Sequence, residues 1–187
     1  MCTRTNNKVW LLALILILTN SIYAQKTNNN MQKHIELTQQ WDKTFPKSDK
    51  VNHKKVIFHN RFGIELVADM YTPQDAKGKL PAIAVSGPYS AVKEQVSGRY
   101  AQHMAEEGFL AIAFDPSYYG ESGGYPRDIT SPSLSTEDFM AAVDFLSVQD
   151  NVNADHIGVI GICGWGGMAL AAASIDPRIK ATATVTM

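Results

Sequence analysis

The feature that most constrains this chain is the stretch from Ile157 to Ala173, which reads IGVIGICGWGGMALAAA. An apolar run leads into Gly161, Ile162 and Cys163, and a run of small, helix-forming residues follows directly. Strand, sharp turn and helix in this order are the layout of a nucleophile elbow, in which a reactive side chain stands at the tip of the turn. The sequence therefore predicts that the sulfur of Cys163 is a nucleophile.

A second segment, Gly120-Glu121-Ser122-Gly123-Gly124, matches G-x-S-x-G literally. That motif needs a strand ending at the nucleophile and a helix starting just after it. Ser122 instead follows Pro116 and two tyrosines, and Pro126 comes soon after it. We interpret the segment as a glycine-rich loop at the C-terminal end of a strand, where ligands commonly bind in open α/β sheets.

Short apolar segments alternate with amphipathic ones along the rest of the chain. The predicted strands are 55–59, 64–71, 81–85, 109–114, 157–162 and 179–186, with a turn at 60–63 between the first two. Helices are predicted over 92–104, over 134–146 and directly after Cys163. Short, wholly apolar strands that alternate with helices indicate a mostly parallel sheet covered on both faces, so the predicted fold class is α/β.

The N-terminus has the pattern of an export signal. Arg4 and Lys8 precede the apolar run from Val9 to Leu18, and a polar break leads to Ala24. This predicts a secretory signal peptide over 1–24 and a periplasmic or extracellular protein, with an uncleaved membrane anchor as the alternative. The apolar run is shorter than the roughly 20 residues that span a bilayer, so no membrane association is expected after cleavage.

Composition and cysteine usage narrow the remaining possibilities. The chain has 187 residues, 45% of them hydrophobic, and a formal net charge of −1, which favours one globular domain over a disordered or nucleic-acid-binding protein. We expect a polar extension over 25–50 and the folded domain over 51–187. Cleavage removes Cys2, so Cys163 cannot form an internal disulfide. A buried structural cysteine and a thiol-redox role are the alternatives for Cys163, although redox chemistry lacks a second, resolving cysteine.

These motifs resemble the dienelactone-hydrolase-like branch of the α/β-hydrolases, whose elbow reads G-x-C-x-G-G with a cysteine nucleophile. The resemblance covers 51–187 and rests on Lys93-Glu94-Gln95 at the expected start of the first large helix, on the 114–124 loop, and on Gly161-Ile162-Cys163. Trp165 departs from the family pattern. The resemblance implies an α/β-hydrolase fold and hydrolysis of small-molecule esters or lactones, without a metal or organic cofactor.

The expected chemistry begins with attack of the Cys163 thiolate on an ester carbonyl, which forms a thioacyl intermediate that water then hydrolyses. The oxyanion is expected to bind the backbone N–H of Gly164 and a second N–H from the loop after the 81–85 strand. Pro88 in that loop has no N–H, so Tyr89 is the candidate donor. No group of His, Cys, Asp and Glu has the spacing of metal ligands.

The partners of the nucleophile are harder to place. In this fold the acid and the histidine follow the nucleophile along the chain, but Asp176 is the only carboxylate after Cys163, and no histidine follows it. His156 is expected at the far end of the elbow strand, and His103 on a solvated helix face, so neither is assigned as the base. We therefore expect the triad acid and histidine beyond Met187, in a longer hydrolase of which this chain is the N-terminal portion.

The alternative is a catalytically inactive relative that binds a small molecule. The sequence predicts neither the substrate nor the oligomeric state.

Overall fold

The computed structural model describes residues 14–19, which form a short helical segment, and residues 37–187. Contacts divide the chain into two units, Met1–Glu36 and Leu37–Met187, and the second contains all the elements discussed below. Within the described ranges, no helix is long and apolar enough to cross a membrane. The expected signal peptide and its cleavage after Ala24 lie largely outside the described residues, so export stays a prediction.

Strands and helices alternate from residue 51 onward, as expected. The strands are β1 (Val51–His59), β2 (Glu65–Pro73), β3 (Leu80–Ser86), β4 (Leu110–Phe114), β5 (Val152–Ile162) and β6 (Ile179–Val185). The helices are α2 (Val96–Glu106), α3 (Pro132–Ser147) and α4 (Trp165–Ile175). This alternation confirms the α/β fold class.

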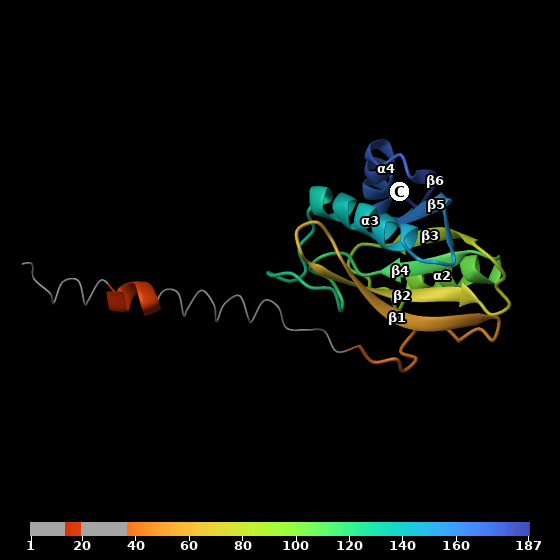
Figure 1. Cartoon of the computed structure of the whole chain (residues 1–187), viewed down its shortest axis with the longest axis horizontal. Helices are drawn as coiled ribbons and strands as arrows, with labels where there is room; N and C mark the ends of the chain where they lie inside the picture. The colour runs from red at the N-terminus through yellow and green to blue at the C-terminus, as the bar shows by residue number, and fades with distance from the viewer. Residues whose placement is uncertain (1–13, 20–36) are drawn as a thin grey trace, which may run out of the picture. The chain divides into compact units, whose positions relative to one another are not determined.

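The six strands form one sheet in the order β1-β2-β4-β3-β5-β6 (Figure 1). Strands β4, β3, β5 and β6 run parallel, while β2 pairs antiparallel with both β1 and β4. Parallel strands end at the same side of a sheet, so the segments that follow these four strands meet there. We call this side the carboxyl edge.

Helices cover both faces of the sheet, and the side chains of β4 show how. Leu110, Ile112 and Phe114 belong to the core that includes α3 and α4. Ala111 and Ala113 alternate with them and belong to the core that includes α2. A strand buried on both faces is apolar throughout, and for this reason the short apolar runs in the sequence predict strands.

Residues 37–50 pack onto the same unit, upstream of the domain start expected at residue 51. Phe45 is buried in the core on the α2 face, and the Trp41 indole donates a hydrogen bond to the Phe45 carbonyl at 3.0 Å. Residues 37–41 contain no helix, and the Trp41 ring contacts Phe45 and His53 of β1 edge-on.

The start of α2 also differs from expectation. The helix begins at Val96 rather than at residue 92, and Lys93 lies in the turn before it. The N–H of Lys93 donates to the Asp115 carboxylate at 2.8 Å, a contact made outside the helix. The apolar spacing that suggested an earlier start does not mark the buried face, because Val96 and Tyr100 are exposed while Ala101 and Ala105 are buried.

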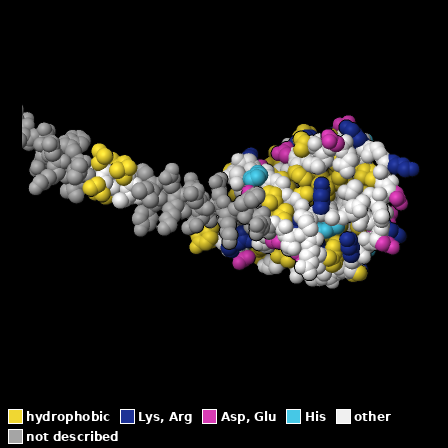
Figure 2. All heavy atoms as spheres, turned by 60° about the horizontal axis from the view of Figure 1, so that its bottom comes forward, with side chains coloured by type: hydrophobic (Ala, Val, Ile, Leu, Met, Phe, Trp, Pro, Cys, Tyr) yellow, Lys and Arg dark blue, Asp and Glu magenta, His cyan; other side chains and the backbone are white. Residues whose placement is uncertain are grey.

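Figure 2 shows charged side chains of both signs spread over the visible face of this unit, with smaller hydrophobic patches between them. No single sign of charge dominates that face. This distribution agrees with a formal net charge of −1.

Candidate active site

Cys163 stands where strand β5 turns into helix α4. The strand ends at Ile162, the helix begins at Trp165, and Cys163 has a φ of +55°. A residue other than glycine rarely adopts the left-handed region, and such strain is found where function requires it. Cys163 is half-buried, and its N–H donates to the Val185 carbonyl of β6 at 2.8 Å. The predicted strand–turn–helix geometry is present.

Glycines on both sides let the turn close tightly. A Cβ at Gly161 would lie 2.3 Å from the Trp165 carbonyl oxygen, so only glycine fits there. On the neighbouring loop, a Cβ at Gly87 would lie 3.1 Å from the Trp165 Cβ and 2.3 Å from the Ile162 oxygen. The indole of Trp165, 1% exposed, therefore enters the core without opening the elbow. This explains how the chain tolerates its departure from the G-x-C-x-G-G pattern.

The two expected oxyanion donors lie on segments that touch each other. Tyr89 belongs to the loop between β3 and α2, residues 87–95, which we call the β3–α2 loop. A Cβ built on Gly164 would lie 3.9 Å from the Tyr89 ring. Neither the N–H of Tyr89 nor that of Gly164 has a hydrogen-bond acceptor within the described part of the chain. Both groups are therefore available to a ligand.

An aromatic cluster lies beside the elbow. The rings of Tyr89, Tyr119 and Trp165 lie with centroids 5.6 to 6.3 Å apart, in tilted and edge-on contacts. The Tyr119 hydroxyl forms a 2.7 Å hydrogen bond with Thr130. Hydrogen bonding to Thr130 lowers the pKa of Tyr89, while burial raises the pKa of Tyr119. Tyr89, 55% exposed, is the member that a ligand can reach.

Ser122 has a different environment from Cys163. Its hydroxyl donates to the Asp115 carbonyl at 2.6 Å and accepts the N–H of Val67 at 2.9 Å, and the residue is 2% exposed. The 115–124 loop follows β4 and contains neither strand nor helix. Ser122 therefore joins this loop to β2, as expected for a residue that is not the nucleophile.

The described histidines all have partners away from the elbow. His53 contacts Asp69, His59 contacts Glu65, His103 contacts Glu106, and His156 contacts Asn153. His103 is exposed, as expected, and His156 is also exposed. His156 lies within β5, which begins at Val152, earlier than the predicted start at residue 157. Asp176 follows the last residue of α4, where Arg178 pairs with it and lowers the pKa of the Asp176 carboxyl. None of these groups supplies a base to Cys163.

A cluster of charges that the sequence did not predict, which we call the ion cluster, includes the end of the β3–α2 loop and is centred on two buried lysines. Its lysines are Lys55 and Lys93, and its carboxylates are Asp42, Glu94, Asp115 and Glu121. Both lysine side chains are fully buried. Burial opposes the charge of Lys93, but the carboxylates of Asp115 and Glu94 more than offset this and raise the pKa of Lys93 above its ordinary value.

Part of this ion cluster has the spacing of a metal site. Oxygens of Asp42, Glu94 and Glu121 lie within 4.8 Å of one another. The ammonium groups of Lys55 and Lys93 already contact these carboxylates, at distances of 2.6 to 3.4 Å. Because each carboxylate is already paired with an ammonium group, their spacing is not evidence of a metal ion.

Backbone strain gathers at the carboxyl edge. Among residues 14–19 and 37–187, those other than glycine with positive φ are Ser90, Tyr118, Asp128, Cys163 and Thr186. Ser90 follows β3, the next two follow β4, and the last two follow β5 and β6. This is the edge where ligands bind in open α/β sheets, and strained residues tend to cluster at functional sites.

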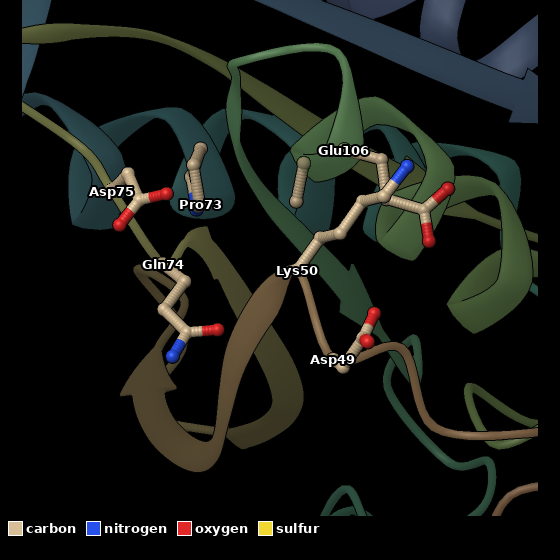
Figure 3. Close-up of a pocket in the computed structure, with 7 residues that line it drawn as sticks. Asp49, Lys50, Pro73, Gln74, Asp75 and Glu106 are labelled. Atoms are coloured by element: carbon tan, nitrogen blue, oxygen red, sulfur yellow. The ribbon is translucent and has the colours of Figure 1, made fainter.

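The pocket drawn in Figure 3 lies elsewhere. It has a volume of about 490 Å³ and is lined by residues at the start of β1, the end of β2 and the end of α2: Asp49, Lys50, Pro73, Gln74, Asp75, Ala105 and Glu106. Since β2 runs antiparallel to β4, its last residue lies beside the start of β4. The pocket is therefore at the edge of the sheet opposite to Cys163.

Comparison with known proteins places the chain in a family. The profile of the X-Pro dipeptidyl-peptidase (S15) family matches residues 63–187, which include every candidate residue named above for the elbow and its loops. The chain belongs to this family. The match begins just before β2 and runs through β6.

Individual relatives agree with this placement. PA2218 of Pseudomonas aeruginosa, an uncharacterized protein, is 58% identical over 181 residues, which are 95% of this chain and 48% of PA2218. Its crystal structure superposes with a TM-score of 0.79 over 82% of this chain and 48% of that one. The thiohydrolase aneE of Aspergillus aculeatus is 32% identical over 133 residues, 71% of this chain and 41% of aneE. The chain thus spans about half the length of the curated relatives it matches.

Similar solved structures identify the fold. The α/β hydrolase GrgF from a Penicillium species is 26% identical, with a TM-score of 0.67 over 71% of this chain and 45% of GrgF. A putative dienelactone hydrolase of Klebsiella pneumoniae, 19% identical with a TM-score of 0.60 over 71% of this chain and 58% of that one, shows the likeness of fold alone. The fold is that of an α/β-hydrolase, as the sequence resemblance implied.

Proposed function

We propose that this protein is a hydrolase of ester or lactone bonds and that Cys163 is its nucleophile. The observation that carries the proposal is the backbone of Cys163, a half-buried thiol held at a φ of +55° between β5 and α4. The family match and the thiohydrolase relative support chemistry at an acyl carbonyl. They also add thioesters and X-Pro peptides to the substrates that a test should include.

The proposed first step is acylation. The Cys163 thiolate attacks the carbonyl carbon, a C–S bond forms, and the carbonyl electron pair moves onto oxygen. The N–H groups of Gly164 and Tyr89, which have no other acceptor within the described residues, would hold this oxyanion. One such donor is typically worth about 2.7–4 kcal/mol. Collapse of the intermediate expels the alcohol, which takes up a proton, and leaves the acyl group on sulfur.

The second step is hydrolysis of the thioacyl intermediate. Water adds to the thioester carbonyl, and the carboxylic acid and the free thiol are released. Since no histidine or carboxylate contacts Cys163 within the described residues, we assign acylation to this chain and assign no general base. The acid and the histidine of a triad are still expected beyond Met187, so the acylation step is the one that residues 37–187 can test.

The alternative is a catalytically inactive relative that binds a small molecule. Trp165 is the residue on which that alternative depends, because an indole at the elbow could block the nucleophile. Trp165 is 1% exposed and packs into the core, whereas Cys163 stays half-buried. This arrangement favours the hydrolase.

The test is a pre-steady-state burst. The purified chain is mixed with p-nitrophenyl acetate, with an acyl thioester and with an X-Pro p-nitroanilide, and product release is followed in wild type, Cys163→Ala and Ser122→Ala. We expect a burst equal to the enzyme concentration in wild type and Ser122→Ala, and none in Cys163→Ala. Prior treatment with iodoacetamide should remove the burst in proportion to the cysteine alkylated. An undiminished burst in Cys163→Ala would overturn the proposal.

A further inference from the structure

We propose that Lys93 is a positioning residue that holds the β3–α2 loop, and with it the N–H of Tyr89, at the distance an oxyanion requires. This inference rests on the proposed function. Lys93 acts indirectly, because its ammonium group contacts the carboxylates of the ion cluster and not the substrate.

The burial pattern of the loop identifies Lys93 as its anchor. Gly87 is buried at the end of β3, residues 88–92 are exposed or half-buried, and Lys93 is again buried, at 1% exposure. Within the exposed part, the Ala91 N–H donates a hydrogen bond of 3.2 Å to the Pro88 carbonyl, which closes a single turn. The first fixed point after Tyr89 is therefore Lys93.

Lys93 is bound through both its backbone and its side chain to Asp115. Its N–H donates to one oxygen of Asp115 at 2.8 Å, and its ammonium group contacts the other oxygen at 2.9 Å. Asp115 directly follows β4, and its own N–H donates to the Val67 carbonyl of β2 at 3.0 Å. One carboxylate thus holds both the backbone and the side chain of Lys93 against the carboxyl edge of the sheet.

Further contacts fix the lysine from other sides. The ammonium group lies 2.6 Å from Glu94 and 2.6 Å from Glu121. Thr44, from the N-terminal segment, donates its N–H to the Glu94 carbonyl at 3.0 Å. The Lys93 charge is therefore buried and paired with two carboxylates of the 115–124 loop and with the adjacent Glu94. Removing such a charge shifts whatever it holds.

Two reactions of Cys163 separate positioning of the loop from reactivity of the thiol. Alkylation by iodoacetamide forms a C–S bond and expels iodide, with no oxyanion. Acylation by p-nitrophenyl acetate passes through an oxyanion, so its rate depends on the Tyr89 N–H. In protein that circular dichroism shows to be folded, the ratio of the acylation rate to the alkylation rate therefore reports on the donor.

The variant is Lys93→Met, which keeps the length of the side chain and removes its charge. We expect this ratio to fall roughly tenfold or more, since misplacing an oxyanion donor has that cost, with the alkylation rate within about twofold of wild type. Lys55→Met is the matched control, because Lys55 is equally buried in the same cluster but belongs to β1. Its ammonium group reaches the loop only through Glu94, at 3.4 Å, and the Asp115 carboxylate pairs with Lys93 instead. The ratio in Lys55→Met should equal that of wild type. Lys93→Arg, which keeps the charge with a different geometry, should give an intermediate ratio.

A ratio in Lys93→Met equal to that of wild type would overturn the inference, as would an equal fall in Lys55→Met. If Lys93→Met does not fold, as judged by circular dichroism, the Lys93→Arg variant carries the test, and a ratio equal to wild type overturns the inference. A wild-type chain that alkylates but does not acylate would contradict the proposed function instead. The two failures are thus distinguishable.

Discussion

Ser122 and Cys163 both lie beside glycines at the carboxyl edge of the sheet, but they differ in burial, hydrogen bonding and backbone conformation. Ser122 is 2% exposed, and its hydroxyl makes one hydrogen bond within the 115–124 loop, to Asp115, and one to Val67 of β2. Cys163 is half-buried at a positive φ between a strand and a helix. A motif of residue types is therefore insufficient to identify a nucleophile. The elements that flank the residue decide whether its side chain is used for structure or is free to react.

The largest expected effect separates the two residues by reactivity. Replacing Cys163 with Ala should lower the acylation rate by about a thousandfold or more, because the nucleophile itself is removed. Stopped-flow release of p-nitrophenol measures this rate. A residual rate within tenfold of wild type would mean that another residue reacts, and Ser122 would then be reconsidered.

The converse substitution tests the structural role of Ser122. Ser122→Ala leaves the Val67 N–H and the Asp115 carbonyl without their partner, both of them on fully buried residues. Each unpaired group costs about 1–3 kcal/mol, so we expect a loss of about 2–5 kcal/mol in the free energy of unfolding. Urea denaturation measures it. Unchanged stability with lost acylation would reverse the roles of the two residues.

The stability of the 115–124 loop, which contains Ser122, should also depend on pH. Asp138 on α3 accepts hydrogen bonds from Asn60 and from the N–H and hydroxyl of Ser117 in the loop. Burial raises the pKa of Asp138 to about 6, against the opposing effect of these bonds.

The sign of the effect follows from that pKa. The folded protein holds the Asp138 proton to higher pH than the unfolded chain does, so this group favours folding at acid pH and loses its effect as pH rises from about 4 to about 6. The change amounts to roughly 3 kcal/mol. It should appear in unfolding free energies of wild type measured across this range and be absent in Asp138→Asn. The same pH dependence in both proteins would show that Asp138 is not its source.

The smallest effects test how tightly the elbow is built. Gly161→Ala would place a Cβ 2.3 Å from the Trp165 carbonyl, and we expect it to cost about 1–3 kcal/mol and to slow acylation. Gly167→Ala, one turn further on, has nothing within 4 Å of its Cβ. This matched variant should stabilise the helix by about 1 kcal/mol and leave acylation unchanged. Thermal melts of the pair, with opposite signs, would confirm close packing at the elbow, whereas equal shifts would contradict it.

The sequence predicted those parts of the fold that depend on local pattern. Strands buried on both faces are wholly apolar, so their positions were readable, and the strand and helix on either side of Cys163 were found where expected. The start of α2 was predicted wrongly because the apolar spacing continues through a turn that Asp115 holds, and this residue lies 22 positions from Lys93. Contacts at such separations leave no periodic trace.

The same limit applies to the candidate site. The nucleophile and the oxyanion donors come from two short segments with recognisable turns, and so could be nominated. The ion cluster combines residues from Asp42 to Glu121, in which each charged residue alone looks like a solvated surface group. Phe45 and Trp41 were likewise assigned to a polar extension, because a few aromatic residues do not change its average polarity.

The most direct test of the central claim is to locate the acyl group. The chain is reacted with p-nitrophenyl acetate, quenched in acid, and analysed by intact mass and by peptide mass spectrometry. We predict one acetyl group per chain on the peptide that contains Cys163, and none there after prior alkylation with iodoacetamide. An acetyl group on Ser122, or no adduct on a chain whose Cys163 alkylates normally, would contradict the account.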